Sequence, residues 1–426
     1  MMSVQCRKRS KRNSIRYLLP KYSINSGILM SEPPKNLKIT EPSADGNKSG
    51  RRNAENSLPA PIFQTATFTF DSTADLAAFH DGESEGYFYT RYGNPTLAAA
   101  ESRLSRLEGA EASLLYASGM AAVSSVFWAL LGPGARLILL GETYRHTRDF
   151  AESLLSRYKV DVEILPENTI DALEKANEGP VRVLFAEIPS NPTMRVPELE
   201  RLAEWARNRG AKLVVDSTIA SPVLLRPLEH GADLVVHSAT KFLGGHNDLL
   251  AGAVSGSRPF IDALVEQQAM LGAVISPHTA FLLERGMKTL GVRVERQSET
   301  ALRLAEFLRE QKQIKCVHYP GLESHPDHKT ARKIMRAFGG LLSFELNGGP
   351  DAADRLVDSL RIPVLAAGFG GTESQAEHHP RMAYADLGLE GAQARGVVPG
   401  LIRYSVGLEN FEALRDDLVE GLRIID

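Results

Sequence analysis

The fold of this chain is decided by the stretch Leu234-Val235-Val236-His237-Ser238-Ala239-Thr240-Lys241-Phe242-Leu243-Gly244-Gly245. Its apolar start is typical of a buried strand, but two hydroxyl side chains, a lysine and two glycines follow. Packing does not explain a lysine at that position. A Schiff base from Lys241 to an aldehyde cofactor explains it, with Ser238 and Thr240 holding the phosphate of that cofactor.

Apolar runs on either side of this stretch predict strands that alternate with helices. The expected strands cover 136–140, 160–165, 181–186, 212–215 and 234–236. Such strands, rich in valine, isoleucine and leucine, indicate a mostly parallel sheet with helices on both faces. After an expected helical stretch over 279–311, the runs 340–346 and 401–405 predict alternating, half-exposed strands. The predicted fold is therefore α/β, with a smaller α+β C-terminal domain.

Length and composition exclude several classes of protein. The chain of 426 residues is long enough for two or three domains. Its only cysteines are Cys6 and Cys316, which excludes a disulfide framework and fits a reducing, cytoplasmic location. The formal net charge of -3 gives no reason to expect nucleic acid or a membrane as a partner. The uncharged segment 112–131 is long enough to span a bilayer, but its serines favour a buried helix with its lead-in strand.

The first 57 residues differ in composition from the rest of the chain. Seven lysines and arginines precede the first acidic residue, Glu32, and a polar run follows. We expect residues 1–57 to form a disordered basic and polar tail, because this composition cannot build a core. An organelle-targeting segment and an upstream start codon ahead of Met30 are the alternatives.

Other expected strand ends carry polar residues that suit the same ligand. Ligands of open parallel sheets bind at the carboxyl ends of the strands. Asp216 there can pair with a protonated ring nitrogen, although a helix-capping role explains it equally well. Gly119, followed by Met120, lets a helix N-terminus approach an anion. Tyr144 can stack on a planar cofactor, or it is an ordinary loop tyrosine.

Several longer motifs occur in a fixed order along the chain. They are 232–248 around Lys241, Tyr89-Thr90-Arg91-Tyr92-Gly93-Asn94-Pro95-Thr96, Ser118-Gly119-Met120-Ala121, Pro189-Ser190-Asn191-Pro192-Thr193 and Arg403-Tyr404-Ser405-Val406-Gly407-Leu408-Glu409. Together they resemble the Cys/Met-metabolism family of pyridoxal-phosphate-dependent enzymes over about residues 58–426. The run 144–148 and the ending His246-Asn247-Asp248 look most like the cystathionine γ-synthase branch.

The resemblance implies a fold-type I transferase that binds pyridoxal 5'-phosphate and assembles as a homotetramer, a dimer of two catalytic dimers. It implies an N-terminal arm over 58–96 that contributes to the active site of the neighbouring subunit. A large cofactor-binding domain over 97–290 and a small C-terminal domain over 291–426 follow.

The resemblance also implies the residues that hold the cofactor. Lys241 would carry it and move protons, Asp216 would hold its pyridine nitrogen, and Tyr144 would stack on its ring and take part in catalysis. The phosphate would be held by a group of four residues, namely Gly119, Met120, Ser238 and Thr240.

Further implied roles belong to the neighbouring subunit and to the substrate. Tyr89 and Arg91 would reach the phosphate bound in the neighbouring subunit. Asn191 would lie near the cofactor's phenolic oxygen and, with Tyr144, near the substrate. Arg403 would bind the substrate α-carboxylate as a two-pronged fork. No metal is expected.

The implied activity is γ-replacement on an activated homoserine ester with cysteine, which forms cystathionine. A γ- or β-lyase, such as a methionine γ-lyase or a cystathionine lyase, and a homoserine sulfhydrylase use the same scaffold and remain alternatives. A non-catalytic relative that acts as a binding module is a remote alternative.

One region departs from the family pattern. The run 366–374 has Gly368 where the family usually has a serine close to the substrate carboxylate and the lysine. Ala367 stands where a glutamate of the distal pocket is frequent. The missing carboxylate weakens the cystathionine lyase alternative, and the missing hydroxyl leaves the specificity open.

Two histidine-containing runs resemble metal-ligand spacing. For His325-Pro326-Asp327-His328 we expect a solvated turn that leads into a helix from Thr330, since a structural zinc needs four ligands. For Glu377-His378-His379 we expect a loop at the rim of the pocket.

Overall fold

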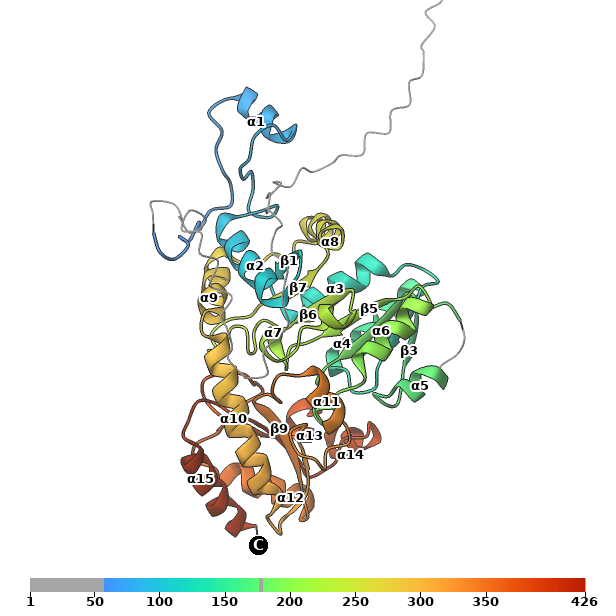
Figure 1. Ribbon diagram of the computed structural model, residues 1–426, viewed down its shortest axis with the longest axis vertical. Helices are drawn as coiled ribbons and strands as arrows, with labels where there is room; N and C mark the ends of the chain where they lie inside the picture. The colour runs from blue at the N-terminus through green and yellow to red at the C-terminus, as the bar shows by residue number, and fades with distance from the viewer. Residues whose placement is uncertain (1–56, 176–178, 426) are drawn as a thin grey trace, which may run out of the picture.

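The computed structural model describes residues 57–175 and 179–425, and it contains two β-sheets joined by helices (Figure 1). The expected tail over 1–57 therefore lies, apart from Ser57, outside the described residues. The seven-stranded sheet is built from residues 112–256 and the five-stranded sheet from residues 314–405.

The first sheet has the strand order β1-β7-β6-β5-β4-β2-β3. Its strands are β1 (Ala112–Tyr116), β2 (Arg136–Leu139), β3 (Asp161–Ile164), β4 (Val183–Glu187), β5 (Lys212–Asp216), β6 (Leu234–His237) and β7 (Gly252–Gly256). Neighbouring strands run parallel from β6 to β3, whereas β7 is antiparallel to both β1 and β6. The mostly parallel sheet is confirmed, and the expected strands lie within one or two residues of the observed ones.

The sequence analysis missed β7. Gly252-Ala253-Val254-Ser255-Gly256 has a single branched apolar residue, so no local pattern indicates a strand. The strand forms because backbone pairing with β1 and β6 surrounds it on both sides.

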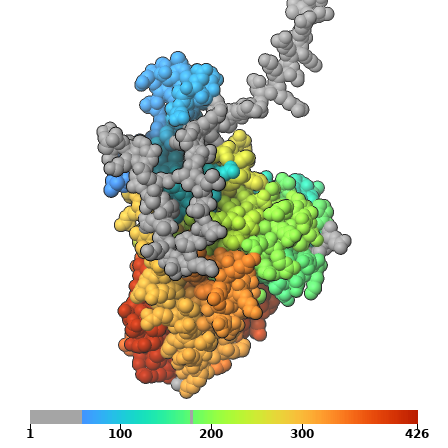
Figure 2. Space-filling view, in the orientation of Figure 1, coloured from blue at the N-terminus to red at the C-terminus, as the bar shows by residue number. Residues whose placement is uncertain are grey.

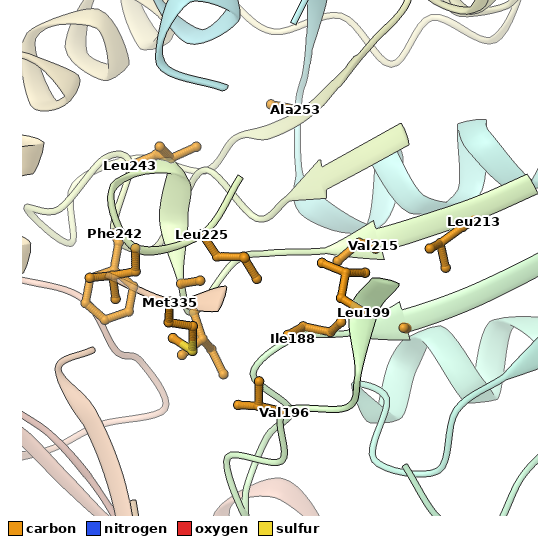
Figure 3. Packing of buried hydrophobic residues seen from close by; sticks show 14 of the residues in the cluster. Ile188, Val196, Leu199, Leu213, Val215, Leu225, Phe242, Leu243, Ala253 and Met335 are labelled. Atoms are coloured by element: carbon orange, nitrogen blue, oxygen red, sulfur yellow. The ribbon is translucent and has the colours of Figure 1, made fainter. Parts of the chain in front are cut away.

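Helices cover both faces of this sheet (Figure 1). They are α2 (Pro95–Glu108), α3 (Gly119–Leu130), α4 (Arg145–Ser153), α5 (Ile170–Lys175), α6 (Leu199–Asn208), α7 (Ser221–Leu224), α8 (Arg258–Leu271) and α9 (Pro277–Met287). Alternate residues of a strand enter different cores, as Leu184 and Phe185 of β4 show. Figure 3 shows the core on the face of Leu213 and Val215, which extends to Met335 in the C-terminal part of the chain.

The segment 112–131 divides into β1 and α3, as expected for a buried helix with its lead-in strand. Across residues 57–175 and 179–425, no helix combines the length and the apolar character that crossing a membrane requires.

The second sheet has the order β10-β11-β12-β9-β8. Its strands are β8 (Ile314–His318), β9 (Leu341–Leu346), β10 (Val364–Leu365), β11 (Gln375–His378) and β12 (Leu401–Ser405). The nearby helices are α10 (Leu290–Arg309), α11 (His328–Ile334), α12 (Gly349–Ser359), α13 (His379–Ala383), α14 (Gly388–Ala394) and α15 (Phe411–Ile424).

The expectation that the strands over 340–346 and 401–405 are half-exposed is wrong. All residues of β9 and β12 are buried. One face, with Leu342 and Phe344, packs against residues of α10, α12 and α15. The other face carries Arg403, which donates a hydrogen bond to Asn191 beyond the end of β4. The polar side chains of this face therefore point into the molecule.

The helical stretch expected over 279–311 is two helices, α9 and α10. From the first turn of α10, the Arg293 guanidinium donates to the carbonyls of Gly286 (2.9 Å) and Phe242 (3.0 Å). A carbonyl at the end of α9 is thus satisfied by a buried side chain, which stabilises the break.

The strand before Lys241 is anchored by a buried pair. His237 at the end of β6 and Glu108 at the end of α2 are both fully buried, with Nε2 and Oε1 2.5 Å apart. Since His237 precedes Ser238, this pair fixes the start of the segment that leads to Lys241.

We expect Glu108→Ala to lower the free energy of unfolding by about 3 kcal/mol, because it leaves a buried imidazole without its partner. Urea unfolding followed by fluorescence measures the change. The exposed Glu152→Ala in α4 is the control and should stay within about 0.5 kcal/mol of the wild type. Equal losses in the two variants would contradict a stabilising role of the pair.

Candidate active site

The site begins at the carboxyl ends of β4, β5 and β6, where Glu187, Asp216 and the segment 238–241 lie side by side. Asp216 Oδ1 accepts hydrogen bonds from the backbone N–H (3.0 Å) and hydroxyl (2.5 Å) of Thr218. The Thr218 hydroxyl in turn accepts from the backbone N–H of Ser238 at 2.8 Å. Burial raises the pKa of Asp216, and the bonds from Thr218 oppose that rise.

A tight backbone contact places the N-terminus of α3 beside Ser238. A Cβ on Gly119 would lie 2.8 Å from the Ser238 Cβ, and one on Gly252 would lie 2.0 Å from the Ser118 carbonyl oxygen. Only glycine fits at either position. The first turn of α3, with Gly119 and Met120, therefore lies against Ser238, and a helix N-terminus beside a hydroxyl is a cradle that suits a phosphate group.

Lys241 follows this cradle and lines a cavity of about 580 Å³. Thr240 lines the cavity too, with its hydroxyl bonded to the backbone of Ala251. Gly368 and Phe369 from the C-terminal part form the opposite wall, and the Lys241 Nζ lies 4.9 Å from the centre of the Phe369 ring. Burial lowers the pKa of Lys241, the charge of Arg403 lowers it further, and Glu377 opposes both.

Arg403 is a buried cation held from two sides. Its guanidinium lies 2.9 Å from Glu377 Oε2, donates to the Gly368 carbonyl (3.2 Å), and reaches Asn191 Oδ1 from the first sheet (3.3 Å). It also lies over the Phe369 ring, 5.2 Å from its centre. Arg403 and Lys241 thus face one aromatic ring in one site.

The expectation of a loop at Glu377-His378-His379 is wrong. Glu377 and His378 belong to β11, with Glu377 directly opposite Arg403 in the ladder with β12, and His379 begins α13. All three side chains are buried. His379 Nδ1 is bonded to Glu377 Oε1 at 2.8 Å, so this histidine acts within the ion pair rather than at a rim.

The sequence analysis also missed Glu187. It ends β4 beside Asp216, and its Oε2 accepts the backbone N–H of Tyr144 at 2.7 Å. Burial and the neighbouring Asp216 raise the pKa of Glu187 well above its usual value. Its place at a strand end, just before Pro189-Ser190-Asn191, is the signal that could have revealed it.

Tyr144 lies just before α4 and is 42% exposed. Burial of the remainder and the nearby Glu187 raise its pKa, and Arg403 opposes this. Tyr89 and Arg91 do not lie with the residues around Lys241 in the described chain. Arg91 donates to the Ala269 carbonyl at 2.6 Å and lies over the rings of Tyr89 and Tyr92.

The run His325-Pro326-Asp327-His328 forms a turn that leads into a helix, as expected, but the expectation that it is solvated is wrong. His325 is buried and bonded to the Thr193 carbonyl, while Asp327 forms an ion pair with Arg195 at 2.6 Å. Helix α11 begins at His328 instead of Thr330. The run joins the C-terminal part to the loop after β4.

A different cluster, Cys316, His318 and Glu345, brings three potential metal-ligand atoms within 4.8 Å of one another. Both Glu345 oxygens already face cations or donors, since Lys315 Nζ and His318 Nε2 each lie 2.9 Å away. We assign no metal to it.

A lysine of lowered pKa, an acid at a strand end and a phosphate cradle define a fold-type I pyridoxal-phosphate enzyme. The family model for "Cys/Met metabolism PLP-dependent enzyme" matches residues 44–423. The chain belongs to this family.

Individual relatives carry two different names. The chain is 39% identical over 378 residues to cystathionine gamma-synthase 1, chloroplastic, of Nicotiana tabacum, covering 88% of this chain and 70% of that protein. It is 43% identical over 368 residues to L-methionine gamma-lyase of Pseudomonas putida, covering 86% and 92%. A solved cystathionine gamma synthase from Xanthomonas oryzae pv. oryzae, in complex with cystathionine, is 35% identical, with a TM-score of 0.82 and coverage of 87% and 94%.

The residues present fit pyridoxal 5'-phosphate. Gly119 and Gly252 let the N-terminus of α3 approach Ser238 and β7 closely, because a Cβ at either position would collide with the neighbouring segment. Asp216 offers a buried carboxylate and Lys241 a half-buried amine, the two groups that this cofactor requires.

We expect Gly119→Ala to weaken cofactor binding roughly ten- to hundredfold, because the new Cβ forces α3 away from Ser238 by an overpacking cost of about 1–3 kcal/mol. Absorbance titration of cofactor-depleted protein with pyridoxal 5'-phosphate measures the affinity. Gly132→Ala, beyond the other end of α3, is the matched control, because nothing lies within 4 Å of its added Cβ. An unchanged affinity in Gly119→Ala would contradict the cradle.

We expect two substitutions to move the pKa of Lys241 in opposite directions. Glu377→Gln removes a carboxylate that raises it, so the pKa falls; Arg403→Gln removes a cation that lowers it, so the pKa rises. The pH dependence of Lys241 labelling by an amine-reactive reagent in cofactor-depleted protein measures both. The exposed Glu390→Gln is the control. Shifts of the same sign would show that packing, not charge, sets the pKa.

Proposed function

We propose that this protein catalyses γ-replacement: an activated homoserine ester and cysteine react to give cystathionine. The Cγ–O bond of the ester breaks, the leaving acid takes the electron pair, and the cysteine sulfur forms the new Cγ–S bond as it loses its proton. The observation that carries this proposal is that Lys241 and Arg403 both lie over the ring of Phe369, at 4.9 Å and 5.2 Å from its centre. An amine that moves protons and a cation that binds a carboxylate are what an amino-acid substrate requires.

Lys241 supports the chemistry through its lowered pKa, since a neutral amine can take the Cα proton and later return protons. The bound cofactor supplies an electron sink for the negative charge that develops at Cα. Asp216 keeps the ring nitrogen protonated in this proposal, and Tyr144 covers one face of the ring. Gly119, Met120, Ser238 and Thr240 hold the phosphate.

Arg403 is proposed to bind the α-carboxylate of the substrate. Asn191 and the Gly368 carbonyl orient the guanidinium, and Glu377 balances its charge. A planar guanidinium fixed in this way presents two N–H donors to a carboxylate, which sets the direction of the substrate.

A lyase is the second candidate. The relative from Pseudomonas putida, at 43% identity, is named L-methionine gamma-lyase. On the same site, release of keto acid and ammonia would replace transfer to a thiol. A β-lyase and a homoserine sulfhydrylase are further variants of the same chemistry, differing in the bond broken or the thiol accepted.

We also propose that the arm over 58–96 completes the site of a neighbouring subunit in a homotetramer. The helix α1 (Thr73–His80) buries none of its residues in its own chain. Figures 1 and 2 show it standing off from the body. The arm carries the ring contacts Phe68–Tyr87 and Phe70–Phe79, an apolar content that a second chain would cover. Tyr89 and Arg91 then reach the neighbour's phosphate.

We expect purified protein to form cystathionine from at least one of the acetyl, succinyl and phosphoryl esters of homoserine when cysteine is present. Borohydride reduction should fix the cofactor on the peptide that contains Lys241, and Lys241→Ala should lose activity by at least a thousandfold. Product analysis with and without cysteine separates transfer from elimination. Keto acid and ammonia from methionine, without cystathionine from any ester, would establish the lyase instead.

A further inference from the structure

The side chain of Gln375 fills the space that a side chain at position 368 would occupy. A Cβ on Gly368 would lie 2.6 Å from Gln375 Oε1, 3.3 Å from its Nε2 and 3.4 Å from its Cδ. Gln375 begins β11, is 6% exposed and lines the cavity of Lys241. The absence of a side chain at Gly368 is therefore matched by an amide that enters from the neighbouring strand.

The direction of this amide is fixed by its neighbours. The Glu373 carboxylate can only accept, so Asn247 turns its Nδ2 toward Glu373 Oε2, at 3.0 Å. Asn247 Oδ1 is then left to accept from Gln375 Nε2, at 3.3 Å. This order directs Gln375 Oε1 away from Asn247 and toward Gly368.

Gln375 Oε1 is buried and has no hydrogen-bond partner. An unpartnered buried acceptor costs free energy, and structures rarely keep one without a reason. A ligand in this cavity that carries an N–H donor would satisfy it.

The chemistry of the reaction identifies the donor. This step rests on the proposed function. With the cofactor bound, the amino group of the first amino acid would be taken up by it, so the N–H donor left free would be the ammonium group of the amino acid that supplies the sulfur. Carboxylates of Asp248 and Glu373 line the same cavity and favour a positive group.

We propose that Gln375 is a specificity-determining residue whose Oε1 binds the ammonium group of the amino-acid sulfur donor, in the space left by Gly368. The enzyme then selects cysteine over a thiol of the same size without an amine.

The test compares cysteine with 3-mercaptopropionate, which is cysteine without its amino group. The KM for cysteine and the inhibition constant of 3-mercaptopropionate against it are measured in the holoenzyme. The wild type should prefer cysteine roughly ten- to hundredfold, as expected for a hydrogen bond to a charged group. Gln375→Met keeps the length of the side chain and removes the acceptor, so the preference should fall to near one.

Two further variants separate binding from structure. Gly368→Ala should displace the amide and lower the preference in the same way, and the double variant Gly368→Ala/Gln375→Met should lose no more than Gln375→Met. Gln393→Met, at an exposed position in α14, is the matched control and should keep the preference. Thermal unfolding and the cofactor absorption spectrum check that each variant is folded and loaded.

A wild-type preference that survives in Gln375→Met overturns the assignment, although the enzyme still makes cystathionine. If the wild type makes no cystathionine from any ester, the proposed function fails first and the assignment of Gln375 falls with it.

Discussion

Burial of the Arg403 guanidinium is the constraint on which the geometry of the site depends. A buried cation is tolerated only where a counter-charge and hydrogen-bond acceptors surround it. The partners of Arg403 come from both parts of the chain. Glu377 and Gly368 belong to the C-terminal part, and Asn191 follows β4 of the first sheet. The cation therefore holds the two parts of the chain in one arrangement.

That arrangement brings two cations close to the Phe369 ring and gives the site its electrostatic character. Arg403 and Lys241 both lie over this ring, and the charge of Arg403 contributes to the lowered pKa of Lys241. Glu377 limits the effect because it is the counter-charge of Arg403 and also raises the pKa of Lys241. The Arg403–Glu377 ion pair thus adjusts the pKa of Lys241, and in the proposed function the same pair orients the cation for the substrate carboxylate.

The sequence reveals those parts of the site that follow a single strand. Lys241 could be singled out because packing does not explain a lysine shortly after an apolar run, and Asp216 because it ends such a run, although a helix cap explains Asp216 equally well. Glu377, Gln375 and strand β7 could not, since their positions depend on the ladder register with β12, β1 and β6, which no local pattern contains. The same limit explains the error at β9 and β12: alternating polar residues looked solvent-facing, but their polar face turns toward the first sheet.

Gly368 is interpreted differently from the sequence and from the structure. In the sequence, Gly368 reads as the loss of a hydroxyl. In the structure, its missing side chain is the condition for the Gln375 amide to enter the cavity, because even a methyl group would lie 2.6 Å from Oε1. Gly371 leaves room in the same way for the Asn247 amide that orients Gln375, since a Cβ on Gly371 would lie 2.2 Å from that amide. Two glycines therefore make room for two amides, and the polar group of this wall comes from β11 rather than from the loop before it.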